Sequence, residues 1–259
     1  MFEQLNRSVN CLKSEIKNIK INFMENQNKV AFITGGSKGI GFAVAEALIN
    51  DGIKVAITSR NLKEIESATQ ALNNKKDGFA MGFVADVKDF DSQKAVIEQV
   101  ILKWGRLDYV VANAGVGHFA PIQELSHEQW QETLDVNLTG VFNSIKATYT
   151  HLKDSKGYFI SIASLAGTNF FEKGGAYNAS KFGLVGFSQA IMMDLRKDGI
   201  KVTTIMPGSV ATYFNGHIPN EKDAWKIQPE DIGQIVSDLI KMPSRTLPSK
   251  IEVRPSFPA

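Results

Sequence analysis

The chain has 259 residues, of which 43% are hydrophobic and 22% charged, values typical of a soluble globular protein. Its 29 basic and 27 acidic residues leave a net charge of +2, which excludes a strong electrostatic footprint for nucleic acid or an acidic membrane. Cys11 is the only cysteine, so an intrachain disulfide is excluded, and no Cys/His cluster has the spacing of a zinc site. We therefore expect no metal.

Residues 1–28 form an N-terminal extension. Its apolar residues recur at helical spacing, at Phe2, Leu5, Val9, Leu12, Ile16 and Ile19. The stripe is either a packing arm or part of an upstream extension, with Met24 as the true start, which we favour slightly. An organelle-targeting helix is a third interpretation, which Glu3 and Glu15 count against. Because no apolar run could span a bilayer and no secretory signal is present, we expect a cytoplasmic protein.

After the extension, short β-branched runs alternate with longer amphipathic stretches. The predicted strands are 30–34, 53–58, 78–85, 107–112, 157–162, 201–206 and 251–253. The predicted helices are one ending near 50 and those over 62–73, 90–104, 126–153 with a break near Asn137, 176–197 and 229–241. This alternation predicts an α/β protein with a doubly wound Rossmann fold: a seven-stranded parallel sheet with helices on both faces, in a single domain over 29–259.

A glycine-rich turn joins the first strand to the first helix. Glycines there permit a tight turn and close backbone approach to a pyrophosphate, which would lie at the helix N-terminus. A plain turn is the alternative, but the position between a strand and a helix favours dinucleotide binding. The residues expected to contact the pyrophosphate region are Gly35, Ser37, Lys38, Gly39, Ile40 and Gly41.

The end of the second strand indicates which dinucleotide is bound. NAD-binding proteins usually place an acid there, whereas this chain has Thr58, Ser59 and Arg60. Arg60 can bind a ribose phosphate bidentately, and Lys38 adds a second positive charge. The sequence therefore predicts NADP(H) in preference to NAD(H), with two solvated surface cations as the alternative.

Tyr177 and Lys181 are four positions apart and so share one face of the predicted helix. A nearby ammonium can stabilise the phenolate and lower the phenol pKa from about 10, which would make Tyr177 a usable acid and base. Such pairs are also common in helices that carry no chemistry, so the other motifs decide the interpretation.

The motifs occur together in the order typical of one family. They are the glycine loop, Asn113-Ala114-Gly115, Asn137, Ser164, Tyr177, Lys181 and Pro207-Gly208. With them the chain resembles the classical short-chain dehydrogenase/reductase family from about residue 29 to 255, and within it the 3-oxoacyl-thioester reductase-like members. One departure is Ala112, where the family's Asn-Asn-Ala-Gly signature begins with asparagine.

This resemblance implies a proton relay. Tyr177 would protonate the substrate carbonyl, and Lys181 would lower the Tyr177 pKa and hold the nicotinamide ribose. Ser164 would hydrogen-bond the substrate oxygen, and Asn137 would anchor a water that links Lys181 to solvent. The implied cofactor contacts are Asp86, Val87, Asn113, Ala114, Gly115, Tyr177, Lys181, Pro207, Gly208, Val210 and Thr212. Asp86 alone could equally be a turn or capping acid.

The expected function is therefore NADPH-dependent reduction of a carbonyl, in a ketone or a 3-oxoacyl thioester, to an alcohol. The substrate would be a small molecule or a carrier-bound thioester, although no basic cluster marks a docking patch for an acidic carrier. The alternative is a protein that senses NADP(H) on the same fold without turnover. A serine hydrolase is disfavoured because no Gly-x-Ser-x-Gly elbow surrounds Ser164.

Three loops should form the substrate side: 118–121, 168–171 and 213–228. Their aromatic residues favour an apolar pocket, and the shortness of the last loop predicts a shallow, open site with little lid. The resemblance also implies a homo-oligomer, a tetramer or dimer, built through the helices that begin near 137 and 176. The apolar residues that could serve this interface or the core are Phe142, Phe182, Leu184, Phe187 and Met192.

Overall fold

The computed structural model describes residues 29–257, so the predictions for 1–28 lie outside the described residues. Within 29–257, seven strands form one parallel sheet in the order β3-β2-β1-β4-β5-β6-β7. The strands are β1 (Val30–Ile33), β2 (Lys54–Ser59), β3 (Ala80–Val84), β4 (Tyr109–Ala112), β5 (Tyr158–Ile162), β6 (Lys201–Pro207) and β7 (Lys250–Val253). The doubly wound Rossmann fold is confirmed, and the strand order reverses between β1 and β4, where such folds bind ligands.

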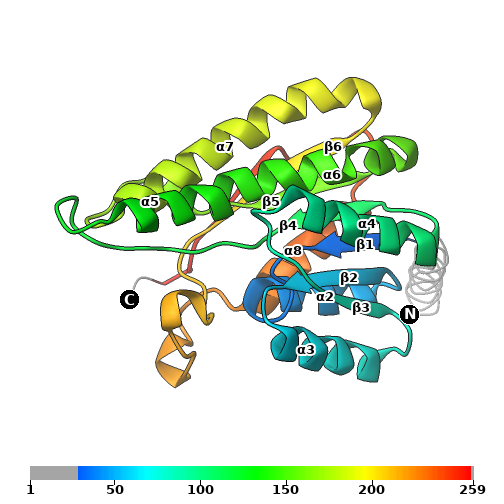
Figure 1. Ribbon diagram of the computed structural model, residues 1–259, viewed down its shortest axis with the longest axis horizontal. Coiled ribbons are helices and arrows are strands. Elements are labelled where there is room, and N and C mark those ends of the chain that lie inside the picture. Colours follow the sequence, from blue (N-terminus) through cyan, green and yellow to red (C-terminus); the bar gives the residue numbers. More distant parts are fainter. Residues whose placement is uncertain (1–28, 258–259) are drawn as a thin grey trace, which may run out of the picture.

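Helices cover both faces of the sheet (Figure 1). One layer contains α2 (Gly39–Asn50), α3 (Leu62–Lys75) and α8 (Pro229–Lys241), and the other contains α4 (Phe90–Trp104), α6 (Gly140–Ser155) and α7 (Gly175–Leu195). Because both faces are covered, all four residues of β1 are buried. Successive residues join different cores: Ile33 packs with the α2 layer, and Phe32 packs with the α4 layer.

Side-chain caps fix where several helices begin. Asn61 accepts a hydrogen bond from the Glu64 N–H at the start of α3, and Asp89 accepts from the Asp91 N–H at the start of α4. Ser126 and Gln129 form a capping box at the start of α5 (His127–Leu134). The cap of α3 places its first turn at the cleft, where Asn61 and Glu64 form part of the lining.

The predicted break near Asn137 is a π-helix and not a loop. The chain runs from α5 through η1 (Asp135–Thr139) into α6 without leaving helical backbone geometry. Single π-helical turns inside α-helices occur frequently at functional sites. Here the turn contains Asn137, whose side chain is fully buried.

Asp108 ties β1 to β4 at the amino end of the sheet. Its carboxylate lies 2.9 Å from the Lys29 Nζ and 2.7 Å from an Arg106 guanidinium nitrogen. It also accepts a 3.0 Å hydrogen bond from the Val30 N–H. Asp108 is almost fully buried, so removing its charge leaves donors without their acceptor.

We expect Asp108→Asn to lower the free energy of unfolding by about 2 kcal/mol, because a buried charged acceptor serving two cations and one backbone N–H is lost. Urea unfolding followed by circular dichroism measures the change. Asp77→Asn is the matched control, since Asp77 is exposed, and it should unfold like the wild type. Equal stability of both variants would contradict the role given to Asp108.

Candidate active site

A single cleft of about 1570 Å³ runs along the carboxyl ends of the strands. The glycine loop and the segments after β2, β3, β4, β5 and β6 line it. The predicted site residues that line it are Gly35, Ser37, Lys38, Gly39, Ile40, Arg60, Asp86, Val87, Asn113, Ala114, Gly115, Ser164, Tyr177, Lys181, Pro207, Gly208, Val210 and Thr212. Gly41 and Asn137 lie behind this lining, and each supports it through contacts described below.

The glycine loop is shaped to admit a pyrophosphate. Gly35 adopts a left-handed conformation with φ 64°, which a side chain would strain. A Cβ on Gly41 would lie 2.3 Å from the Gly35 carbonyl oxygen and 2.5 Å from the Asn113 Nδ2, so only glycine fits there. Lys38 precedes α2 without capping it by a side-chain hydrogen bond. The N–H groups of the first helical turn therefore remain available to an anion, which fits a dinucleotide.

Asn113 holds this loop against β4. Its Nδ2 donates to the carbonyl oxygens of Thr34 and Gly35, each at 3.0 Å. The Thr34 hydroxyl in turn accepts from the backbone N–H groups of Asn113 and Ala114. The Asn113 side chain is thus committed to positioning the loop, a role that neither spacing nor composition indicated.

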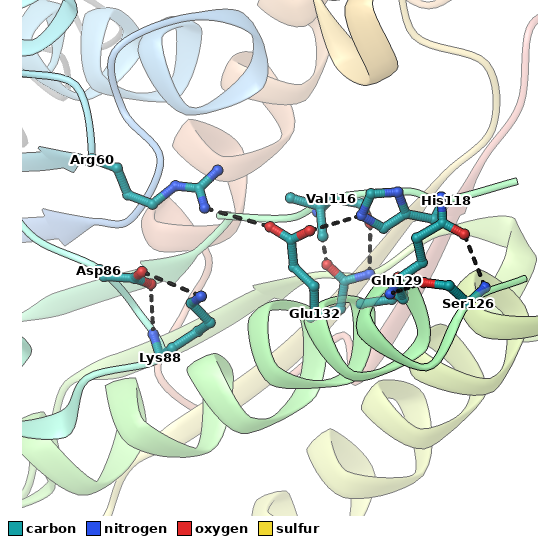
Figure 2. Close-up of polar contacts among 10 residues, drawn as sticks. Arg60, Asp86, Lys88, Val116, His118, Ser126, Gln129 and Glu132 are labelled. Atoms are coloured by element: carbon teal, nitrogen blue, oxygen red, sulfur yellow. Dashed lines mark hydrogen bonds and ion pairs between the residues drawn. The ribbon is translucent and has the colours of Figure 1, made fainter.

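The segment after β3 is fixed from two sides. Asp86 accepts a hydrogen bond from the Lys88 N–H at 3.0 Å, and the Lys88 ammonium lies 3.6 Å from the same carboxylate (Figure 2). This supports the interpretation of Asp86 as a turn acid. The Val87 carbonyl accepts from the buried amides of Gln93 at 2.8 Å and Asn143 at 3.0 Å. No pattern in the sequence indicated these two amides.

Both cations expected to bind a ribose phosphate face carboxylates. The Lys38 ammonium lies 3.2 Å from Glu64, which also accepts from the Ser37 hydroxyl at 3.3 Å. The Arg60 guanidinium lies 3.7 Å from Glu132. No spacing in the sequence pointed to Glu64 or Glu132. Glu64, for example, resembles an ordinary first-turn acid of α3.

Ser164, Tyr177 and Lys181 converge at the end of β5. Ser164 begins the 3₁₀-helix η2 (Leu165–Gly167), and its hydroxyl accepts from the Ala166 N–H at 3.1 Å. The Lys181 ammonium donates to the Ile162 carbonyl at 3.1 Å and lies 5.7 Å from the centre of the Tyr177 ring. The structure therefore brings the three predicted catalytic side chains together.

Burial is the main influence on the pKa values of Tyr177 and Lys181. It raises the pKa of the Tyr177 hydroxyl, and a hydrogen bond with Ser164 opposes the rise. Burial also lowers the pKa of Lys181 to about 8, since an ammonium is poorly solvated there. The protein alone thus shifts Tyr177 opposite to the direction expected from Lys181. A lowering of the Tyr177 pKa by Lys181 stays a prediction.

Asn137 joins the loop after β4 to α7. Its Oδ1 accepts from the Val116 N–H at 2.8 Å, and its Nδ2 donates to the Val116 carbonyl at 2.9 Å and the Ser180 hydroxyl at 3.0 Å. A Cβ on Gly115 would lie 3.4 Å from the Asn137 Oδ1 and 3.8 Å from the Lys181 Nζ. Asn137 therefore packs close to Lys181, the predicted catalytic lysine, while its predicted water stays untested.

Three phenyl rings, one from each predicted substrate loop, surround Tyr177. The ring centres of Phe119, Phe214 and Phe171 lie 5.3, 5.7 and 6.4 Å from that of Tyr177. Their surfaces make this end of the cleft apolar, as expected. Phe119, Phe171 and Phe214 are 37%, 47% and 36% exposed, and the shallow, open site with little lid stays a prediction.

Asp223 organises the loop that carries Phe214. Its carboxylate accepts from the Lys226 ammonium at 2.6 Å, from the His217 ring at 2.6 Å and from the Asn220 N–H at 3.0 Å. These bonds hold the pKa of Asp223 well below its usual range. The loop is thus braced by a carboxylate that stays ionised at neutral pH.

Residues 29–257 carry neither a metal-binding cluster nor a membrane-spanning helix. No group of three or more His, Cys, Asp or Glu side chains in that range could hold a metal ion. Over the same residues, no helix is both long and apolar enough to cross a membrane.

Comparison with known proteins gives concordant results. A family model described as short chain dehydrogenase matches residues 29–223. An uncharacterized oxidoreductase of Staphylococcus saprophyticus is 32% identical over 90% of this chain and 99% of its own length. The D-threitol dehydrogenase of Mycolicibacterium smegmatis is 36% identical over 73% of this chain and 72% of its own. The alcohol dehydrogenase of the archaeon Thermococcus sibiricus, complexed with 5-hydroxy-NADP, superposes with a TM-score of 0.84 at 30% identity, covering 89% of this chain and 98% of that one.

We expect Asp223→Asn to loosen residues 213–228, because the neutral amide cannot replace the charged contacts with Lys226 and His217. Amide hydrogen exchange should show faster exchange in this segment and no change in the central strands. In the wild type the protection should persist as the pH falls below about 4, where an ordinary aspartate becomes neutral, since the lowered pKa keeps Asp223 ionised. Glu221→Gln, an exposed acid of the same segment, serves as control, and equal exchange in both variants would refute the bracing role.

Proposed function

The chain belongs to the short-chain dehydrogenase family and is an oxidoreductase acting on CH–OH or C=O groups with NAD(P), and we propose that it reduces a carbonyl to an alcohol with NADPH. The observation that carries this proposal is the convergence of Ser164, Tyr177 and Lys181 at the apolar end of the cleft. Family membership argues against the alternative of a sensor without turnover.

In the proposed reaction, NADPH supplies a hydride to the carbonyl carbon. Tyr177 donates its hydroxyl proton to the carbonyl oxygen, so that the C=O bond becomes an alcohol and the tyrosine becomes a phenolate. Ser164 hydrogen-bonds the same oxygen as negative charge develops on it. Lys181 stabilises the phenolate electrostatically, so that Tyr177 gives up its proton more readily, and the proton that restores the Tyr177 hydroxyl comes from solvent.

The choice of NADPH rests on Arg60 and Lys38. Both side chains line the cleft beside the glycine loop, and no acid stands at the end of β2 in their place. The complex of the similar alcohol dehydrogenase with 5-hydroxy-NADP agrees with this choice. Guanidinium binds phosphate oxygens bidentately, so Arg60 would hold the ribose phosphate and Lys38 would add a point charge.

The substrate that fits best is an uncharged ketone with an apolar group beside the carbonyl. Phe119, Phe171 and Phe214 would contact that group, and the rings around Tyr177 would exclude water from the reacting carbonyl. A 3-oxoacyl thioester stays a second candidate, because the same walls can accept an acyl chain.

The helix faces expected at a subunit interface are partly exposed. Phe142 is 45% and Phe182 is 38% exposed, and Phe170 stacks on Phe182 with ring centres 5.4 Å apart. Leu184 instead lies in the core, and Phe187 and Met192 pack against it. The exposed aromatic face supports the proposal of a homo-oligomer. A cytoplasmic location remains a proposal from the sequence.

We expect Tyr177→Phe to retain NADPH binding and to lose about 10²- to 10⁴-fold in kcat, because the proton donor is gone while the ring remains. Fluorescence titration measures binding, and NADPH oxidation with a panel of aromatic and aliphatic ketones measures turnover. Tyr149→Phe is the control, since Tyr149 bonds to Asp198 away from the cleft, and it should keep full turnover. Equal turnover by Tyr177→Phe and the wild type would refute the proposed mechanism.

The pH profile should reflect Lys181. Because burial lowers its pKa to about 8, the ammonium dominates below that pH and the neutral amine above it. We expect kcat/KM for carbonyl reduction to fall as the pH rises through about 8, since the neutral amine no longer stabilises the Tyr177 phenolate. Ser164→Ala should be slower at every pH but keep the same midpoint. A rate that stays constant to pH 10 would contradict the role of Lys181.

A further inference from the structure

Each cation that the proposed function assigns to the ribose phosphate already has a carboxylate partner in the cleft. Glu64 lies 3.2 Å from the Lys38 ammonium, and Glu132 lies 3.7 Å from the Arg60 guanidinium. Both acids line the same cleft as the two cations. A phosphate that approaches Arg60 and Lys38 therefore also approaches two negative charges.

Each carboxylate has a second polar contact that keeps it in the cleft beside its cation. Glu132 is held on its other side by His118, whose Nε2 lies 2.9 Å from its carboxylate, and Figure 2 shows Arg60, Glu132 and His118 in one continuous chain of contacts. The His118 bond also lowers the Glu132 pKa, so the side chain is ionised at neutral pH. Glu64 accepts a 3.3 Å hydrogen bond from the Ser37 hydroxyl in the glycine loop.

The two acids affect the binding of NADPH and of NADH differently, because the cofactors differ in charge at this position. A phosphate monoester carries a charge of about −1.5 to −2 at neutral pH, whereas the ribose hydroxyl of NADH is neutral. Each carboxylate repels the phosphate and competes with it for a cation, so both effects weaken NADPH binding. NADH binding is weakened neither by the repulsion nor by the competition, because NADH places no charge beside Arg60 and Lys38.

We propose that Glu64 and Glu132 are selectivity-determining residues, which compete with the ribose phosphate for Lys38 and Arg60 and so limit the preference for NADPH over NADH. This inference rests on the proposed use of NADP(H). The preference for NADPH over NADH is then limited by two acids on helices α3 and α5, and not by a residue at the end of β2.

The test is a fluorescence titration with NADPH and with NADH of the wild type, Glu132→Gln and Glu64→Gln. In each variant the Kd for NADPH should fall by about three- to tenfold, and the Kd for NADH should change by less than about twofold. The gain should shrink in about 0.5 M salt, because ions screen the removed repulsion. A purely structural role would move both Kd values together.

Matched controls remove one acid from each helix at positions without these contacts. Glu128 lies one turn before Glu132 on α5, and Glu66 is an exposed residue of α3 that forms no ion pair with another described residue. Glu128→Gln and Glu66→Gln should leave both Kd values unchanged. If they tighten NADPH binding as much as Glu132→Gln does, the effect comes from net charge alone and the inference is refuted.

Two outcomes separate this inference from the proposed function. If the wild type binds NADPH and neither Glu132→Gln nor Glu64→Gln binds it more tightly, the inference is wrong and the proposed function stands. If the wild type binds neither nucleotide, the proposed function itself is wrong. The two substitutions lie on different helices, so either variant carries the test should the other fail to fold by circular dichroism.

Discussion

The cleft depends on a close contact of backbone with backbone at the switch point of the sheet. The start of α2 approaches the glycine loop so closely that Gly41 has no room for a Cβ, and Asn113 bonds the loop to the end of β4. This contact fixes where the first helical turn points and how far β4 lies from β1. The positions of the catalytic group and of the nucleotide cations follow from these two elements, since their own strands are paired in register with β1 and β4.

The cations at the two ends of the cleft differ in their exposure to solvent. At the apolar end, the Lys181 ammonium is almost fully buried and bonds a backbone carbonyl rather than a carboxylate. At the other end, Arg60 and Lys38 are half exposed and face acids. The first arrangement keeps a cation available for a developing anion, because no fixed anion neutralises it. In the second, each cation already faces a carboxylate, so an anion that binds there must compete with that acid.

The order of elements could be predicted from the sequence because strand and helix periodicities differ and because both faces of the sheet are buried. The convergence of Ser164, Tyr177 and Lys181 and the position of the glycine loop could also be predicted, since these residues lie at strand ends or four positions apart on one helix. The pairs Lys38–Glu64 and Arg60–Glu132 could not. They join different elements, and the periodicity that defines a helix does not say which neighbouring loop its polar face meets. A break near Asn137 could be predicted, but its form as a π-helix could not, because the extra residue is accommodated without a turn signal.

That π-helix has a consequence for the phase of the helix that precedes it. Successive residues of an α-helix are rotated by about 100°, so one residue inserted in a turn rotates everything before it relative to everything after it. With α6 anchored on the sheet, η1 sets the rotation of α5 about its axis. A shortening of this turn by one residue would swing the Glu132 side of α5 away from Arg60 while leaving α6 in place. The single extra residue thus sets the rotation of α5 about its axis. It thereby determines how Glu132 faces the cleft, without any change in the packing of the core.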